Sequence, residues 1–161
     1  MFLNMKKLVI IIVLVVAFIS CQSDVKFNNP SFQGNKDNVF WRAIQSKAIL
    51  ATNGSLSIEA YTSYEKVTLK TTSTAPQTYL LGTSTSKTAT YVLTDATGAV
   101  TFSTGTGIGD GQIVITEYDG VNKTVSGTFK FNAKNTSNNP LYGPNLNFQY
   151  GVFYKVPVGS L

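Results

Sequence analysis

The sequence predicts an all-β protein, an antiparallel β-sandwich of nine or ten strands, on three observations. Charged residues make up only 13% of the 161 residues, and threonine, tyrosine and phenylalanine are abundant, a bias that favours strands over helices. Apolar and polar residues alternate with a period of two in short runs that turn-forming residues separate. Beyond the N-terminal apolar stretch, no segment keeps a helical period over three turns. Because this pattern does not give strand order, a lipocalin-like β-barrel is the alternative.

The clearest strand is "LNFQYGVFYKVPV", residues 146–158. Its alternating apolar positions are Leu146, Phe148, Tyr150, Val152, Tyr154, Val156 and Val158. We expect these seven side chains to share the core face, with Phe153 on the opposite face. Pro157 lacks a backbone donor and therefore marks an edge or an end of the strand.

A predicted hairpin precedes this strand. Residues 111–119 ("GQIVITEYD") and 124–133 ("TVSGTFKFNA") form two alternating arms, and Gly120 in the turn 119–123 can take a positive φ. The half-polar arms indicate antiparallel pairing. Weaker strands are expected at residues 39–44, 47–52, 56–62, 66–71, 78–82, 89–94 and 99–104.

The N-terminus predicts export and a lipid anchor. Lys6 and Lys7 precede twelve apolar residues, 8–19, a length typical of a secretory signal and short of the ~20 residues of a spanning helix. The adjoining "FISC", residues 18–21, resembles the bacterial lipobox, with Ser20 before the only cysteine. The resemblance implies cleavage before Cys21 and diacylglycerol on its sulfur. We therefore expect a signal at 1–20, a flexible tether at 21–37 and one all-β domain at 38–161.

The residues after the cysteine bear on localisation. Gln22 resembles the sorting position of outer-membrane lipoproteins, which implies the outer membrane as the destination. Surface-exported lipoproteins carry an acidic cluster here, whereas this chain offers only Asp24. The periplasmic and surface faces therefore both stay open. The expected partner is the membrane itself, through acyl chains on Cys21.

Composition excludes several classes of function. Without Lys6 and Lys7, 11 basic residues remain against 8 acidic ones, a net charge of +3, and the lysines are scattered. A nucleic-acid partner is not expected, since it needs a basic stripe. The chain has no histidine, and one cysteine cannot form an internal disulfide or a zinc thiolate cluster. We expect no cofactor.

Carboxylates and glycines provide few candidates for chemistry. Glu117 and Asp119 share a strand face, so they are the candidate pair for a carboxylate-based hydrolase. With Asp110 they are also weak candidates for a calcium site, although no D-x-D-x-D-G run exists. The Gly-rich run "TGTGIGDG", residues 104–111, lacks the lysine of a phosphate-binding loop and is typical of a loop before a strand.

Aromatic side chains are the candidates for ligand contact. They are Trp41, Tyr61, Tyr64, Tyr79 and Tyr142. Each of them can stack on a sugar ring, and the four tyrosines are expected to be exposed. The alternative for an aromatic residue on a short strand is a place in the core.

Three segments together resemble a known family. They are "FQGNKDNVFWRA" at 32–43 with its preceding lipobox and tether, "GQIVITEYDGVNKTVSGTFKFNA" at 111–133, and "GVFYKVPV" at 151–158. This combination is similar to a family of small uncharacterised lipoproteins of the Bacteroidota. The resemblance implies no activity, since its motif residues are core and turn formers.

These observations leave three hypotheses for function. The first is a lipid-anchored outer-membrane lipoprotein that serves as a non-catalytic binding or structural module for an envelope protein or a glycan. The second is a carrier that holds an apolar ligand inside a β-barrel. The third is the hydrolase that uses Glu117 and Asp119. Missing catalytic groups favour the first, so we do not expect an enzyme.

Overall fold

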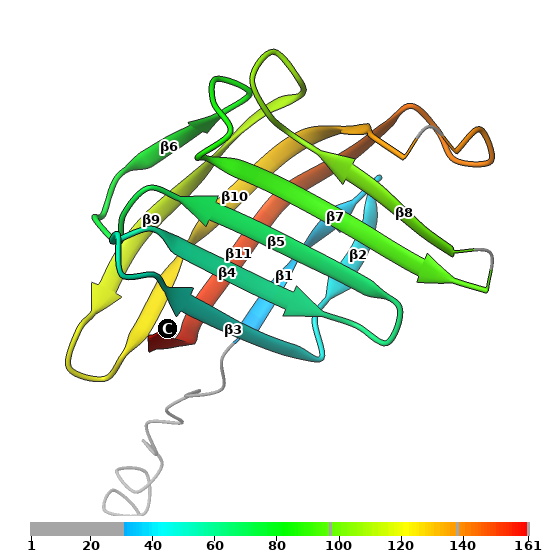
Figure 1. The fold of residues 1–161 in the computed structure, drawn as a ribbon. Helices are drawn as coiled ribbons and strands as arrows, with labels where there is room; N and C mark the ends of the chain where they lie inside the picture. The colour runs from blue at the N-terminus through cyan, green and yellow to red at the C-terminus, as the bar shows by residue number, and fades with distance from the viewer. Residues whose placement is uncertain (1–30, 97, 138, 161) are drawn as a thin grey trace, which may run out of the picture.

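The computed structural model describes residues 31–96, 98–137 and 139–160, and within these ranges it is all-β (Figure 1). The strands are β1 (Ser31–Lys36), β2 (Val39–Arg42), β3 (Gln45–Leu50), β4 (Leu56–Tyr61), β5 (Glu65–Thr71), β6 (Thr78–Leu81), β7 (Thr88–Asp95), β8 (Gly98–Ser103), β9 (Asp110–Asp119), β10 (Thr124–Asn135) and β11 (Asn145–Ser160). The predicted all-β class is confirmed, with eleven strands in place of nine or ten. Nothing in the described ranges forms a helix long and apolar enough to cross a membrane.

Hydrogen bonding joins the strands into one mixed sheet that folds into two layers. One layer has the order β2-β1-β11-β10-β9-β6 and the other β3-β4-β5-β7-β8 (Figure 1). The end of β11 pairs with β3 in parallel, and the end of β10 pairs with β8, so the layers are joined at both corners. All other neighbours are antiparallel. The fold is therefore sandwich-like with a barrel-like closure, and the purely antiparallel prediction is wrong at the β3–β11 pair.

The domain includes residues that the sequence pattern assigns to the tether. β1 lies within 21–37, pairs with both β2 and β11, and buries Phe32 to 1% exposure. The predicted boundary at residue 38 is therefore wrong by at least one strand. Only one large apolar side chain marks β1, which is why its polar, Asn-rich sequence resembles a spacer. Cys21, the predicted signal and the first part of the tether lie outside the described residues.

Two β-bulges break the predicted alternation of β11. Between Phe148 and Gly151, β11 advances three residues while β10 advances two, and Tyr150 takes a left-handed φ of 53°. The same happens before Val156, where Lys155 has a φ of 47°. Each extra residue reverses the facing of the side chains after it, because side chains alternate strictly along a strand. Tyr150, Val152 and Tyr154 therefore point outward, and Phe153 is fully buried.

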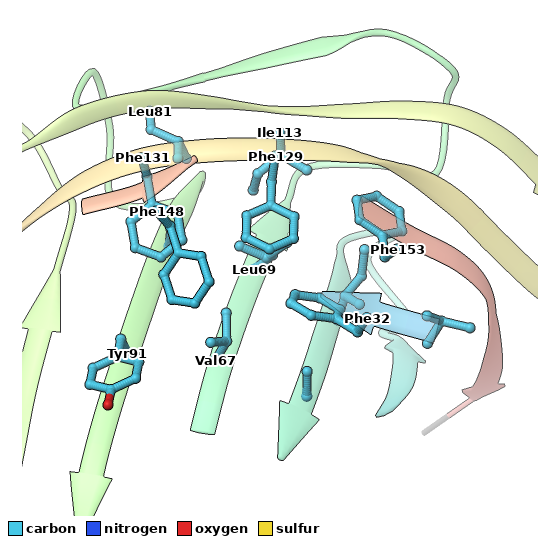
Figure 2. Packing of buried hydrophobic residues seen from close by; sticks show 14 of the residues in the cluster. Phe32, Val67, Leu69, Leu81, Tyr91, Ile113, Phe129, Phe131, Phe148 and Phe153 are labelled. Atoms are coloured by element: carbon cyan, nitrogen blue, oxygen red, sulfur yellow. The ribbon is translucent and has the colours of Figure 1, made fainter. Parts of the chain in front are cut away.

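Aromatic rings fill the space between the layers. In Figure 2, Phe129, Phe131 and Phe148 reach from one layer toward Val67, Leu69 and Tyr91 of the facing layer. Ring centroids of Phe148 lie 5.7 Å from Phe129 and 5.2 Å from Phe131. Phe32 and Phe153 continue the cluster toward the other end of the sandwich. The interior is therefore a packed aromatic core.

Candidate functional site

The most connected polar group of the described chain is Glu65, at the start of β5. Its Oε1 accepts hydrogen bonds from Lys36 Nζ and from the Tyr91 hydroxyl, the latter at 2.5 Å. Its Oε2 accepts from Trp41 Nε1 at 2.6 Å and from the Thr62 hydroxyl at 3.2 Å. We call these five residues the Glu65 cluster. It joins the β1–β2 hairpin in one layer to β5 and β7 in the other.

Electrostatics fix the charge state of the Glu65 cluster. Burial by itself raises the pKa of Glu65, but the hydrogen bonds from Lys36, Tyr91 and Trp41 outweigh it, and the pKa lies below its ordinary value of 4.5. Burial and the neighbouring Glu65 carboxylate raise the pKa of Tyr91, so its hydroxyl stays a donor. A carboxylate with four donors has no free lone pair directed at a substrate. The Glu65 cluster therefore serves to connect the two layers through hydrogen bonds and an ion pair.

A second carboxylate is held on the outer face of the β3-β4-β5 layer. Glu59 accepts from Lys66 Nζ at 2.6 Å and from the Tyr61 hydroxyl, and Lys47 Nζ lies 3.6 Å away. Both ammonium groups also lie over the Tyr61 ring, 5.4 Å and 5.7 Å from its centroid. Burial raises the pKa of Glu59, yet the bonds from Lys66 and Tyr61 bring it below its ordinary value. This group too is satisfied internally.

The structure does not bring the predicted metal candidates together. Asp110 and Asp119 are the two ends of β9, roughly 30 Å apart at the rise of a strand. Asp119 accepts from the backbone amides of Val121 and Asn122, and these bonds lower its pKa. Glu117 is exposed on the same strand. Within the described ranges, no group of three acidic, cysteine or histidine residues is placed to hold a metal ion.

Two of the five candidate contact aromatics take the alternative place, in the core. Trp41 and Tyr79 are core residues, 5% and 2% exposed. Trp41 points inward because Phe40 and Arg42 take the outer positions of β2, and the Tyr79 hydroxyl bonds the carbonyl of Ala75 at 2.9 Å. The other three have different surroundings. Tyr61 lies between its two lysines, Tyr64 is exposed, and Tyr142 packs at the core margin with its hydroxyl bonded to Asp95.

The Gly-rich run 104–111 forms an ordered turn. The amide of Gly105 bonds the carbonyl of Ile108 at 2.8 Å, and the amide of Gly107 bonds the carbonyl of Gly82 at 2.9 Å. Gly109 and Gly111 have positive φ, and a Cβ there would stand within 2.3 Å of backbone oxygens of β10. These glycines therefore serve close packing of the turn on β10.

The hollows on the surface of the described chain include the following two. One, about 490 Å³, lies at the loop end of the sandwich, between Ser55, Lys70 and Ser86. The other, about 470 Å³, lies on the outer face of the β1-β11-β10-β9 region and is lined by Gln112, Thr128, Phe129, Lys130, Gln149, Tyr150, Gly151 and Val152. We call the second hollow the Tyr150 groove. Both volumes fall in the range of small-ligand sites.

The Tyr150 groove is built by strand register. Lys130 of β10 lies opposite Gln112 of β9 and opposite the bulge at Gln149 and Tyr150 of β11. The bulge turns Tyr150 out of the core, and 81% of its side chain is exposed. β-bulges are frequent where a strand must redirect a side chain next to a binding site. The groove is the candidate functional site.

Sequence reasoning missed Tyr150 because period-two alternation placed it in the core. One signal in the sequence marks it. Gly151 is an isolated glycine inside a strand pattern, which indicates a bulge or a close backbone approach. A bulge next to Gly151 exchanges the inward and outward positions beyond it, which exposes Tyr150 and buries Phe153.

The fold and the groove together define a small sandwich-like all-β domain with a hollow on one outer face. Residues 28–157 match the DUF6252 family, a domain of unknown function, and the chain belongs to this family. No curated protein and no solved structure matches the chain.

Proposed function

We propose that this DUF6252 protein is a lipid-anchored outer-membrane lipoprotein, of the kind found in Bacteroidota, that serves as a non-catalytic binding module. The observation that carries the binding role is the Tyr150 groove, where a mostly apolar hollow lies on an otherwise closely packed sandwich. The anchor rests on the sequence, with the apolar signal, Ser20 and Cys21 in lipobox order. Acyl chains on one cysteine give stable attachment, at about 0.8 kcal/mol per buried methylene.

The state of the carboxylates supports a non-catalytic role. Glu65 and Glu59 each accept bonds from lysine and tyrosine, Asp119 accepts from its own turn, and Asp110 accepts from Asn132 Nδ2 at 2.8 Å. A general acid or base needs an oxygen free to reach the substrate. The hydrolase alternative loses support, because Asp119 of its pair is committed to the turn beside Gly120.

The packed interior weighs against the carrier alternative. A carrier needs an internal cavity, whereas Phe129, Phe131 and Phe148 occupy the space between the layers. The two hollows described above open instead at the surface. A ligand therefore binds on the outside of the sandwich in this proposal.

The anchor is tested on the full-length chain expressed in a bacterium with an outer membrane. Cys21→Ala should move the protein out of the membrane fraction and abolish incorporation of an alkynyl fatty acid, while Gln22→Ala, its neighbour, should keep both. Membrane retention and labelling of Cys21→Ala at the wild-type level would contradict the proposal.

A further inference from the structure

We propose that the Tyr150 groove binds an acidic saccharide, with Tyr150 stacking on a sugar ring and Lys130 pairing with a carboxylate or sulfate of the glycan. This inference rests on the proposed binding function and names the ligand class of its site.

The backbone of Tyr150 is strained. Its φ of 53° lies in the left-handed region, which costs a residue with a Cβ atom about 1–2 kcal/mol. The bulge lies opposite Lys130, between the paired positions Phe131↔Phe148 and Phe129↔Gly151. Strain of this kind persists where surrounding structure imposes it, and it concentrates at binding sites. Its consequence here is an aromatic ring presented to solvent from the middle of a sheet.

Polar side chains without a partner in the described chain surround this ring. The side chains of Gln112, Thr128, Lys130 and Gln149 line the groove, and none of them makes a hydrogen bond or an ion pair with any other described residue. Two amides and one hydroxyl supply both donors and acceptors. Sugar hydroxyls need this mixture at their edges, while the C–H face of the ring packs on an aromatic surface.

The charge of the groove lining is positive. Lys130 is the one charged residue that lines the groove. The nearest carboxylate along the sheet is Asp110, which is already bonded to Asn132 Nδ2 at 2.8 Å. An ammonium group without a partner complements an anion, so a glycan with acidic substituents fits better than a neutral one.

The groove is part of a longer exposed surface that runs across the strands. Strand pairing continues the row of groove residues to Asn35 and Phe40 on one side and to Leu80 on the other, all exposed or half-exposed. Six adjacent strands span roughly 24 Å at the usual strand spacing. A row this long suits an extended polymer lying across the strands, and Phe40, Tyr150 and Leu80 offer it separate apolar surfaces on which the C–H faces of sugar rings can pack.

The test uses the full-length lipoprotein in detergent micelles. Its binding to polygalacturonate, alginate, hyaluronate and chondroitin sulfate is compared with binding to methyl-esterified pectin and dextran, by calorimetry and affinity electrophoresis. We expect at least one acidic polymer to bind more tightly than the neutral ones. Tyr150→Asn should weaken that binding about tenfold, and Lys130→Gln about fivefold with a shallower salt dependence. Asparagine tolerates the left-handed backbone, and a urea transition measured on each variant verifies its folding.

Two matched controls make the assignment specific. Tyr64→Asn removes an exposed aromatic ring elsewhere, and Lys134→Gln removes an exposed charge four residues from Lys130 on the same strand and face. Both should bind like the wild type. The inference is overturned if none of the acidic polymers binds, or if folded Tyr150→Asn binds them unchanged. If a displayed peptide library instead gives ligands whose binding depends on Tyr150, the saccharide ligand is wrong but the proposed binding function still holds. The fractionation of Cys21→Ala tests the lipid anchor independently of the ligand.

Discussion

The ring of Phe153 lies directly over Gly127, its antiparallel partner in β10. A Cβ atom built on Gly127 would stand 2.4 Å from this ring and 2.0 Å from the carbonyl oxygen of Val114. The relationship repeats in the opposite sense two pairs along, where the ring of Phe129 covers Gly151, at 2.6 Å from a built Cβ. In both cross-strand pairs an aromatic ring packs against the backbone of a glycine, and the two pairs stabilise the part of β11 that lies between its bulges.

Gly127→Ala should therefore destabilise the protein strongly. The new methyl group meets a backbone oxygen that cannot rotate away, as well as the buried Phe153 ring, so β9, β10 and β11 must separate. Overpacking of this kind costs about 3 kcal/mol or more when the obstacle is backbone. The free energy of unfolding in urea measures it.

Gly105→Ala is the matched control. Gly105 has no positive φ, and a built Cβ meets nothing within 4 Å. We expect a change within about 0.5 kcal/mol of the wild type. Equal losses in the two variants would show that close packing at Gly127 is not the cause.

Tyr150→Asn should keep or raise stability by about 0.5–1 kcal/mol, because asparagine enters the left-handed region more easily than tyrosine. The Tyr150 ring is mostly in water, so its removal leaves no cavity. Thermal or urea unfolding of the full-length chain measures the change. Tyr154→Asn, on the same strand with no left-handed φ, should show no gain. A clear loss of stability in Tyr150→Asn would show that the ring stabilises the fold and that backbone strain at residue 150 is not the dominant effect.

β11 shows which part of the fold could be predicted from its sequence. Alternation identifies the strand, its length and the ends, since Leu146, Phe148, Val156 and Val158 are buried as expected. Alternation fails in the middle of the strand, because each bulge adds one residue and the hydrophobic pattern does not reveal where that residue is inserted. The second bulge restores, from Val156 onward, the facing that the first bulge reversed. Both ends of β11 therefore fit the simple alternation, whereas the side chains in its centre face the opposite way. The parallel pairing of β3 with the end of β11 depends on which strands lie side by side in space, and alternation does not encode this.

Glu65→Gln should destabilise the protein at neutral pH by about 2 kcal/mol, because Lys36 loses its carboxylate in a position where only 25% of its side chain is exposed. The pKa of Glu65 is lower in the folded protein than its ordinary 4.5. The carboxylate therefore contributes stability above pH 4.5, and this contribution is lost as the pH falls through the folded pKa. Urea unfolding at a series of pH values from about 7 to about 3 measures both effects.

In the Glu65→Gln variant, the decline in stability below pH 4.5 should be shallower than in the wild type. Glu117→Gln, which removes an exposed carboxylate, is the control and should keep the wild-type slope. Parallel pH profiles for wild type and Glu65→Gln would contradict a charged Glu65 in the folded state.

The Glu65 cluster could not be predicted from the sequence either, and the reason differs from the one that applies to the centre of β11. Lys36, Trp41, Glu65 and Tyr91 come from four strands, and no local motif joins them. Lys36 also lies in the segment whose composition predicts a tether. Trp41 is predicted to contact ligand as an aromatic surface, whereas its indole N–H is the feature that the structure uses. These residues come together because of how the two layers are aligned on each other. This alignment depends on strand register throughout the fold and not on any local sequence motif.

Trp41→Phe should cost about 1–2 kcal/mol, since it removes one hydrogen bond to a charged acceptor and keeps most of the ring. If the bond to Glu65 is the cause, the same substitution in a Glu65→Gln background should cost clearly less, and the double-mutant cycle should give a coupling energy of about 1 kcal/mol. Pairing Trp41→Phe with Tyr79→Phe, whose hydroxyl bonds a separate loop, should give additive losses. Unfolding in urea at neutral pH measures all the variants. Additivity between Trp41→Phe and Glu65→Gln would mean that the indole stabilises β2 through packing on Phe32 and Phe148 alone, since both rings meet it edge-on at 6.0 Å and 5.5 Å.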